Sequence, residues 1–330
     1  MDKPSESSEV QTWLAGARPR VSVDEVTATA QGRWGLGAFV KELGSHQDRN
    51  FLFESSRGPV IVKIANPSWQ RAALDAQTAA MRTAAASDVV VPTLVQEVTT
   101  ERFGDQEYLA HVVTFIEGET LFDRSAVGPA ECRALGLAAG EMVRTLSGFS
   151  HPGAVRESEW DLRSAEAVLE QKNPALREAV SPSLARVAAL STRLPIQVIH
   201  GDISDSNVLL TRTDEVAVID FGDIGVSWRC AELAVGAACV LGKTTDDVDA
   251  VIAVVESFAD RITLTEDELS AVWSLMVLRT AVLLATGDDD GGEPNAYTRE
   301  REAFERAGFA AAQALDADQM ERRIHRAASR

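Results

Sequence analysis

The stretch that decides the fold of this chain is His200-Gly201-Asp202-Ile203-Ser204-Asp205-Ser206-Asn207, with Asp220-Phe221-Gly222 beginning thirteen residues after Asn207. Short apolar runs flank both pieces, so we expect them at the ends of strands. In such a loop Asp202 can accept the proton of a substrate hydroxyl, while Asn207 turns its amide oxygen toward a metal ion. Asp220 ends a strand that would hold its carboxylate rigidly. These hard oxygen ligands suit Mg²⁺, which takes its remaining ligands from water and substrate phosphates.

The spacing is that of the protein-kinase pattern H-R-D-x-x-x-x-N followed by D-F-G, with Gly201 in place of the arginine. The pattern requires a lysine on the third strand of a preceding lobe, and Val60-Ile61-Val62-Lys63 supplies one. Lys63 would bind the α- and β-phosphates of ATP. The alternative is that the acidic segments are unrelated loops and Lys63 a solvated residue at a sheet edge. The combination favours the kinase-like site.

The residues before this site predict a small β-rich N-lobe over 35–116. Runs rich in Val, Ile, Phe and Leu, separated by turn-like segments, predict a three-stranded meander and then a hairpin. The strands are expected at 38–43, 50–54, 60–65, 93–98 and 107–114. The Ala-rich segment 68–86 lacks Gly and Pro, which predicts a helix capped by Ser68. Residues 1–34 form a polar lead-in with short helices expected at 10–15 and 23–30.

The residues after a connector at 115–120 predict a larger, mostly helical C-lobe over 117–330, which carries the catalytic loop and the substrate-binding helices. A β-rich island at 197–220 interrupts its helices. The helices are expected at 129–146, 163–171, 182–193, 229–241, 246–260, 266–285 and 298–314. The predicted fold class is α+β, with a bilobal, protein-kinase-like architecture. Clefts between lobes are favoured ligand sites, so we expect the site there.

Composition excludes several other classes of protein. Among 330 residues, 45% are hydrophobic and 25% charged, which excludes collagen, a long coiled coil and global disorder. The net charge of −18 argues against a nucleic acid or an anionic membrane surface as partner, and is compatible with an amine-bearing substrate. The three cysteines show no paired spacing, the N-terminus shows no signal-peptide pattern, and the apolar run 271–285 is too short to span a bilayer. We therefore expect a cytoplasmic protein.

With these motifs, the chain resembles the aminoglycoside phosphotransferase family of small-molecule kinases over roughly residues 35–310. HGDISDSNVLL, VAVIDFGD and QDRNFLF are most similar to its hydroxylysine-kinase branch, as is the late EPNAY. The resemblance implies phosphorylation of a hydroxyl group on a small, often amine-bearing molecule, with ATP or GTP and Mg²⁺. It implies Asp202 as catalytic base, Asn207 and Asp220 as metal ligands and Lys63 as phosphate clamp. It also implies that the backbone of Thr114, Phe115, Ile116 and Glu117 holds the adenine.

The chain departs from the kinase pattern in its N-lobe. Kinases pair the clamp lysine with a glutamate on the N-lobe helix, but no Glu lies between Lys63 and Gln96. Gln77 falls nearest the expected place and could orient Lys63 by a neutral hydrogen bond, about half as strong as a charge-assisted one. A G-x-G-x-x-G loop is also absent. Backbone amides of the turn 44–49, together with Ser45 and Arg49, are expected to cover the phosphates instead.

The residues around the catalytic loop indicate a small acceptor. Few residues separate Gly222 from Glu232, which leaves no platform for a polypeptide. Asp205, Asp223 and Glu232 are carboxylates suited to a substrate ammonium, and Arg229 suits a substrate carboxylate. Alternatives stay open for each. Asp205 could cap the loop, Asp223 could be a second metal ligand or a structural acid, and Arg229 and Glu232 could pair with the loop or with each other.

We therefore expect an ATP- and Mg²⁺-dependent phosphotransferase acting on a hydroxylated amino acid or an amino alcohol. Two alternatives remain: a kinase that modifies aminoglycosides or similar antibiotics, and a degenerate kinase fold that binds a nucleotide or metabolite without chemistry. The missing helix glutamate motivates the second. The sequence does not fix the oligomeric state.

Overall fold

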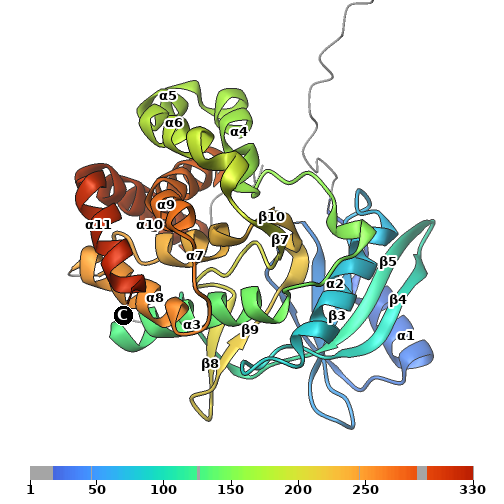
Figure 1. Ribbon diagram of the computed structural model, residues 1–330. Helices are drawn as coiled ribbons and strands as arrows, with labels where there is room; N and C mark the ends of the chain where they lie inside the picture. The colour runs from blue at the N-terminus through green and yellow to red at the C-terminus, as the bar shows by residue number, and fades with distance from the viewer. Residues whose placement is uncertain (1–17, 46, 125–126, 245, 288–295, 330) are drawn as a thin grey trace, which may run out of the picture.

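A computed structural model describes residues 18–45, 47–124, 127–244, 246–287 and 296–329, and it has the expected α+β architecture of two lobes (Figure 1). The N-lobe is built on a five-stranded antiparallel sheet in the order β1-β2-β3-β5-β4. Its strands are β1 (Phe39–Leu43), β2 (Arg49–Phe53), β3 (Val60–Ile64), β4 (Leu94–Phe103) and β5 (Gln106–Thr114). The predicted meander and hairpin are thus confirmed. The helix expected at 10–15 lies outside the described residues.

Two helices complete the N-lobe. Helix α1 (Val23–Trp34) begins at a capping box between Ser22 and Glu25 and buries Val26 and Ala30 in the core of the sheet. This helix belongs to the lobe rather than to a loose lead-in. Helix α2 (Arg71–Ala84) starts later than predicted, after Gln70. The Ser68 hydroxyl donates to Asn66 Oδ1 (2.7 Å) instead of capping the helix, so the cap prediction was wrong.

The C-lobe is mainly helical, and α9 (Glu266–Thr286) runs through its core. Around α9 pack α6 (Ser181–Leu190), α7 (Arg229–Ala238), α10 (Ala296–Ala314) and α11 (Ala317–Ala328). At 21 residues α9 is long and apolar enough to cross a membrane, but 78% of its most apolar window is buried inside the protein, as in the core helix of a globular domain. The remaining helices are α3 (Pro129–Thr145), α4 (Ala165–Lys172), α5 (Pro174–Ala179) and α8 (Asp247–Ala259).

The β-rich island carries the catalytic segments on two small sheets. One pairs β6 (Gly118–Thr120), β8 (Val208–Thr211) and β9 (Val216–Val218), and the other pairs β7 (Ile196–Ile199) with β10 (Gly225–Trp228). Strands β6 and β10 and helix α5 were not predicted because they are short. Helix α11 was also missed, although Met320, Ile324 and Ala327 form a buried apolar face at helical spacing. The loop 200–207 joins β7 to β8, so both of its ends are fixed by strand pairing.

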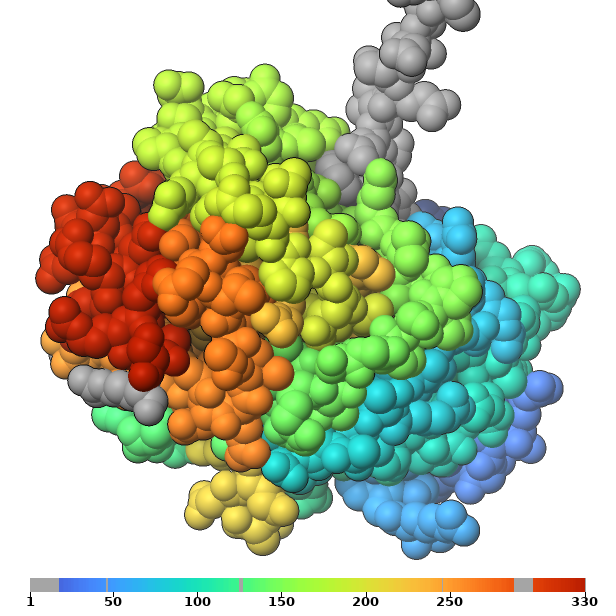
Figure 2. Space-filling view, in the orientation of Figure 1, coloured from blue at the N-terminus to red at the C-terminus, as the bar shows by residue number. Residues whose placement is uncertain are grey.

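The two lobes meet along α2, which packs against the short 3₁₀ turns η1 (Pro152–Ala154) and η4 (Phe221–Asp223) of the C-lobe. The contact is tight: a Cβ on Gly153 would lie 1.7 Å from the carbonyl oxygen of Ala72. In Figure 2 the N-lobe (blue to teal) and the last helices (orange to red) lie on opposite sides of the face shown, with the middle of the chain between them. This packing brings β3 against the loop that follows β9.

Candidate active site

Lys63 of the N-lobe reaches the acidic residue that follows β9 in the C-lobe. Its Nζ lies 3.0 Å from Asp220 Oδ1, across a separation of 157 residues in the sequence. Lys63 lies toward the end of β3, paired with His111 of β5, so its backbone is fixed on both sides of the strand. The predicted approach of Lys63 to Asp220 is therefore present in the structure.

Asp220 is held in an unusual backbone conformation. Its φ of 60° is left-handed, which Asp tolerates better than most residues, and its Oδ1 also accepts from the Gly222 amide (3.2 Å). Such conformations persist where the surrounding structure enforces them, often at functional sites. The left-handed backbone and the two contacts to Oδ1 together fix the orientation of the carboxylate.

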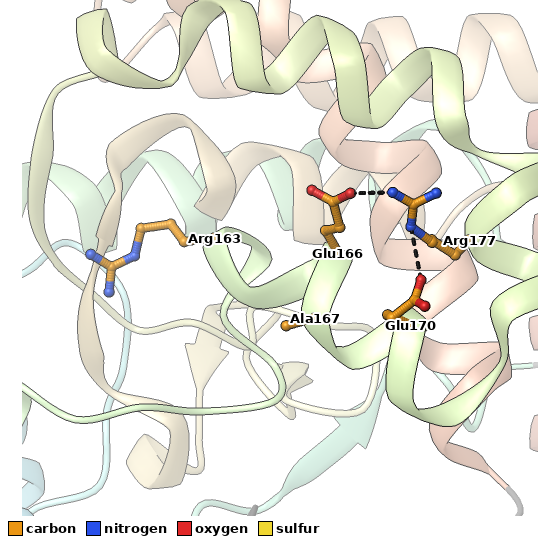
Figure 3. A pocket seen from close by; sticks show the side chains of 5 residues that line it. All are labelled: Arg163, Glu166, Ala167, Glu170 and Arg177. Carbon is orange, nitrogen blue, oxygen red and sulfur yellow. Dashed lines mark hydrogen bonds and ion pairs between the residues drawn. The ribbon is translucent and has the colours of Figure 1, made fainter. Parts of the chain in front are cut away.

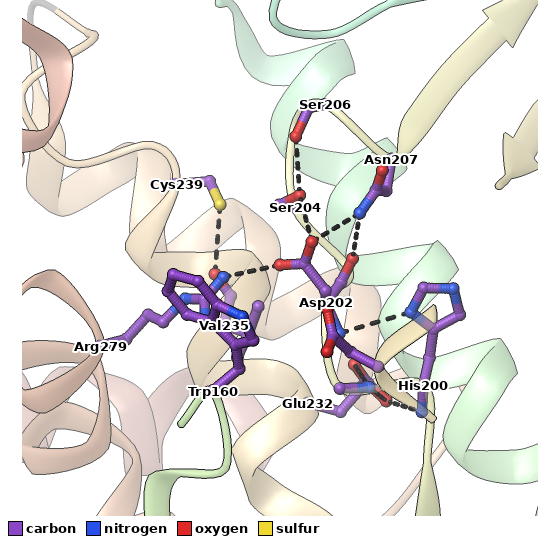
Figure 4. A network of polar contacts seen from close by, with 12 residues as sticks. Trp160, His200, Asp202, Ser204, Ser206, Asn207, Glu232, Val235, Cys239 and Arg279 are labelled. Carbon is purple, nitrogen blue, oxygen red and sulfur yellow. Dashed lines mark hydrogen bonds and ion pairs between the residues drawn. The ribbon is translucent and has the colours of Figure 1, made fainter. Parts of the chain in front are cut away.

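The catalytic loop holds Asp202 between two partners (Figure 4). Asn207 Nδ2 donates to Asp202 Oδ2 (2.6 Å) and to the Asp202 carbonyl (3.1 Å), while Arg279 Nη2 donates to Oδ1 (2.6 Å). Ser204 Oγ also donates to Oδ2 (3.4 Å), whereas Oδ1 accepts only from Arg279 among the described residues and keeps a second lone pair that can accept a substrate proton. Asp202 is thus oriented on both sides.

The same contacts agree with a divalent metal bound by Asn207 and Asp220. Because the nitrogen of the Asn207 amide faces Asp202, its oxygen faces away from that residue. The side chain of Asp220 is 47% exposed, and both of its hydrogen bonds involve Oδ1. Among the described residues no group of three His, Cys, Asp or Glu side chains could hold a metal alone. This donor set suits Mg²⁺, which binds proteins through one or two carboxylates and completes its shell with water and phosphate.

Gly201 and Glu232 shape the catalytic loop. Gly201 has a left-handed φ of 85°, and a Cβ there would lie 2.6 Å from the Asp223 carbonyl oxygen, which explains glycine in place of the kinase arginine. Glu232 is fully buried and accepts from the amides of His200 (2.6 Å) and Gly201 (3.2 Å). Burial raises the pKa of Glu232 to about 7. Glu232 therefore supports the loop and does not face a substrate, contrary to its predicted role.

His200 also supports the loop. Its ring is buried edge-to-face against Phe221 at 4.9 Å, and its Nδ1 accepts from the Asp202 amide (3.4 Å). Burial lowers the pKa of His200, so the ring stays neutral near pH 7. The neutral imidazole of His200 therefore connects the catalytic loop with the Asp220-Phe221-Gly222 turn, because it contacts the Asp202 amide in the first and the Phe221 ring in the second.

Asp48 is a second acid beside Lys63 that the sequence did not single out. Burial by itself would lower the pKa of Lys63, but the charges of Asp220 and Asp48 outweigh it and raise that pKa. Lys63 in turn lowers the pKa of Asp220. Asp48 Oδ1 accepts from the Asn66 amide (2.8 Å) and from Trp69 Nε1 (3.1 Å), which fixes it just beyond β3. The signal available in the sequence was its place in the predicted phosphate-covering turn.

Gln77 and Ser45 make contacts other than those expected. Gln77 Nε2 donates to the Gly222 carbonyl (3.3 Å), so the structure shows it bound to the turn after Asp220 and not to Lys63. Ser45 Oγ accepts from the Asp48 amide (3.2 Å) and closes its own turn, while Arg49 pairs with Glu42 (2.6 Å). His46 lies outside the described residues. The orienting charge for Lys63 comes from Asp48 and Asp220 rather than from α2.

Two of the residues predicted to bind the acceptor are already paired. Arg229 forms a two-pronged ion pair with Glu268 at the start of α9 (2.8 and 2.6 Å), so it does not present a free guanidinium to the catalytic loop. Asp205 pairs with Lys243, whose ammonium also lies over the rings of Phe122 and Phe304. These contacts satisfy both groups and contradict their predicted substrate roles.

Asp223 remains in the site. It lies 3.6 Å from Arg156, and burial, with the negative charge of Asp202 next, raises the pKa of Asp223 to about 7. Arg279 was missed as a site residue. The signal was present, because a single arginine interrupts the apolar run of α9, and a buried charge needs a partner.

The segment predicted to hold the adenine follows β5 and leads to the C-lobe. The Thr114 amide donates to the Thr93 carbonyl (2.9 Å) and the Phe115 amide to the Pro59 carbonyl (3.0 Å). An adenine bound here would therefore use other backbone groups of the segment, such as those of Ile116. The prediction that residues 114–117 hold the adenine loses the amides of Thr114 and Phe115 as free donors, and the binding itself stays a prediction.

A separate hollow lies on the surface of the C-lobe (Figure 3). Arg177 there pairs with Glu166 (2.5 Å) and Glu170 (3.1 Å), and the hollow is wide open to solvent. None of the predicted site residues lines it. Its charges satisfy one another, so we do not treat it as a ligand site.

The fold and the site define a small-molecule kinase with a protein-kinase-like architecture. The sequence matches the family model of the phosphotransferase enzyme family, APH, over residues 40–261, and the chain belongs to that family. No curated protein matched the chain in a sequence comparison. The narrower resemblance to the hydroxylysine-kinase branch stays a prediction.

Solved structures share the fold at low sequence identity. A microcompartment-associated aminopropanol kinase has a TM-score of 0.66 at 16% identity, covering 87% of this chain and 95% of its own. The amicoumacin kinase hAmiN, solved with AMP-PNP, Ca²⁺ and amicoumacin, has a TM-score of 0.64 at 16% identity, and the match covers 90% of this chain and 99% of that kinase. The choline kinase LicA from Streptococcus pneumoniae has a TM-score of 0.57 at 13% identity, and the match covers 87% of this chain and 98% of that kinase.

Proposed function

We propose that this protein transfers the γ-phosphoryl group of ATP, with Mg²⁺, to a hydroxyl group of a hydroxylated amino acid or an amino alcohol. The observation that carries the proposal is the 3.0 Å contact of Lys63 with Asp220 beside a loop that orients Asp202. These residues hold the charges that phosphoryl transfer needs: a cation for the phosphates, oxygen ligands for a metal, and a carboxylate for the acceptor. Kinase structures with the same fold contain AMP-PNP with Ca²⁺, or ADP, which supports nucleotide and divalent-metal use.

Each residue has a defined part in this reaction. The acceptor hydroxyl oxygen attacks the γ-phosphorus, its proton passes to Asp202, and the bond between the γ-phosphorus and the β–γ bridging oxygen breaks to release ADP. Lys63 binds phosphate oxygens once nucleotide draws it from Asp220, and Asp48 keeps a counter-charge beside it. Asn207 and Asp220 would hold Mg²⁺, which would supply neutralisation of the charge that develops on the phosphates. Positioning and electrostatics of this kind supply most of the acceleration in phosphoryl transfer.

The experiment that tests the proposal is a panel assay. The protein is incubated with Mg²⁺ and either ATP or GTP, together with hydroxylysine, homoserine, threonine, ethanolamine or an aminoglycoside, and both nucleoside diphosphate and phosphorylated acceptor are measured. We expect matched formation of the two products with an amino acid or amino alcohol. Nucleotide binding without any transfer would support a binding protein instead, and transfer only to aminoglycosides would support the antibiotic-modifying alternative.

A further inference from the structure

A single arginine from the apolar core helix α9 reaches the catalytic loop. Arg279 is 4% exposed, and its Nη2 lies 2.6 Å from Asp202 Oδ1 (Figure 4). Its guanidinium carbon lies 5.3 Å from the centre of the Trp160 ring, and both side chains are labelled in the same figure. The arginine is thus fixed beside the position that the acceptor hydroxyl must occupy.

Two donor nitrogens of this arginine are unused. Arg279 Nε and Nη1 are buried and have no hydrogen-bond partner among the described residues, and the same holds for Nη1 of Arg156. An unsatisfied buried donor is costly, more so on a charged group. Native proteins keep such groups where a ligand or water completes them. Both arginines therefore point to an acceptor of hydrogen bonds that is not part of the chain.

The two arginines belong to one neighbourhood of the site. Arg156 donates to the Gly222 carbonyl (2.7 Å) and stacks at 4.8 Å on Trp69 of the N-lobe. Arg156, Trp160 and Asp223 line one small pocket next to Gly201. Asp223 interacts electrostatically with both guanidinium groups. Asp202 also acts electrostatically on Asp223, so Asp223 connects this pocket with the catalytic aspartate and with Arg279.

The charges of this region favour an anionic group on the acceptor. The carboxylates that could have received a polycation are engaged elsewhere, Asp205 with Lys243 and Glu232 with the loop amides. Apart from Nε2 of the neutral His200, the buried polar atoms without a partner in this region belong to the two guanidinium groups. A guanidinium presents its donors as a planar fork that matches a carboxylate in two-pronged fashion.

On the basis of the proposed function, we propose that the acceptor carries a carboxylate near its hydroxyl, and that Arg279, assisted by Arg156, binds this carboxylate. Arg279 would then hold the acceptor and Asp202 at the same time and so set the distance between hydroxyl and base. The acceptor class is a hydroxy acid such as a hydroxylated amino acid, and not a simple amino alcohol.

Matched pairs that differ only by a carboxylate test the inference. The pairs are threonine and 1-amino-2-propanol, homoserine and 3-amino-1-propanol, and serine and ethanolamine, with kcat and KM measured for each member. For the pair turned over fastest, we expect the acid to be preferred in kcat/KM by about tenfold to a hundredfold, the range of a buried charge-assisted hydrogen bond. Preference for the amino alcohol, or no preference, would overturn the inference and leave the proposed function standing.

The variant Arg279→Gln locates the preference. We expect it to bring the acid-to-alcohol ratio close to one, mainly through a higher KM for the acid, and Arg279→Lys to restore the ratio only in part because lysine lacks the fork. Arg177→Gln, which removes an arginine from the surface hollow, is the matched control and should leave the ratio unchanged. An unchanged ratio in folded Arg279→Gln would contradict the assignment.

Binding separates the failure of this inference from the failure of the proposed function. If no member of any pair is phosphorylated, calorimetry with a non-hydrolysable ATP analogue and Mg²⁺ measures the affinity for each acid and alcohol. Acid binding that weakens in Arg279→Gln would support the carboxylate site while contradicting kinase activity on these compounds. Absence of acid binding to the wild-type protein would overturn the site.

Discussion

The nucleotide side and the acceptor side of this site differ in how they use charge. On the proposed nucleotide side, Lys63 interacts with two acids, Asp220 and Asp48, and the Asp220 side chain is about half exposed. On the proposed acceptor side, Asp205 and Arg229 form ion pairs inside the C-lobe, with Lys243 and Glu268 respectively. The comparison teaches that a charged residue close to a catalytic loop in the sequence need not face a ligand, because the fold can engage it in an internal ion pair.

The unpaired groups on the acceptor side are the donors of Arg279 and Arg156. Sequence spacing emphasised acids there, whereas the structure leaves cationic donors open. The following variants separate the two sides.

The largest effect is expected from Asp220→Asn. The change removes the charge that pairs with Lys63 and one of the two proposed metal ligands, so kcat should fall by about a thousandfold or more. Rates measured over a Mg²⁺ titration check this, since a lost ligand also raises the metal concentration needed for half-maximal rate. A variant with normal rate and normal Mg²⁺ dependence would show that Asp220 holds no metal.

A smaller effect is expected from Asp48→Asn. Asparagine can still accept from the Asn66 amide and the Trp69 indole, so the turn should keep its shape while Lys63 loses one counter-charge. We expect KM for ATP to change by about threefold to tenfold, in line with about one kcal/mol for a charge interaction near a protein surface. Asp75→Asn on α2, where Asp75 pairs only loosely with Arg71 at 3.7 Å, is the control. Equal behaviour of the two variants would remove Asp48 from the nucleotide side.

The smallest effect is a change in pH dependence in Glu232→Gln. Because the pKa of Glu232 is raised to about 7, the folded protein keeps a proton that the unfolded chain loses above its ordinary value of 4.5. Stability should therefore decline as pH rises from about 4.5 through 7, where the unfolded state binds fewer protons. Denaturant unfolding between pH 5 and 8 should show a shallower decline in Glu232→Gln. The decline should not vanish in this variant, because Asp223, whose pKa is also raised to about 7, still makes stability depend on pH.

An unchanged slope in that variant would mean that Glu232 is ionised in the folded protein. Its two loop amides would then be stabilised by a full negative charge, and the loop would belong electrostatically with the nucleotide side. The expected result keeps Glu232 as a support that is neutral below its raised pKa of about 7.

The sequence predicted the fold and the approach of Lys63 to Asp220, because both follow from local patterns, but it did not predict the contacts that Ser45 and Gln77 make. Alternating apolar runs specify β1 to β5, and the spacing from Asp202 to Asn207 and on to Asp220 specifies one loop between strands. The acceptor side could not be predicted in the same way. Whether Arg229 faces a substrate depends on Glu268, far along the chain on another helix, and Asp205 likewise depends on Lys243. Pairing of this kind is a tertiary property.

The central claim is tested most directly by following the γ-phosphoryl group of labelled ATP in wild-type protein and in Asp202→Asn, with the best acceptor of the panel. The account predicts label on the acceptor oxygen, and a loss of about a hundredfold to ten-thousandfold in the variant, as for removal of a general base, with nucleotide affinity unchanged. Transfer at the wild-type rate by Asp202→Asn, or label that never reaches a small acceptor, would contradict it.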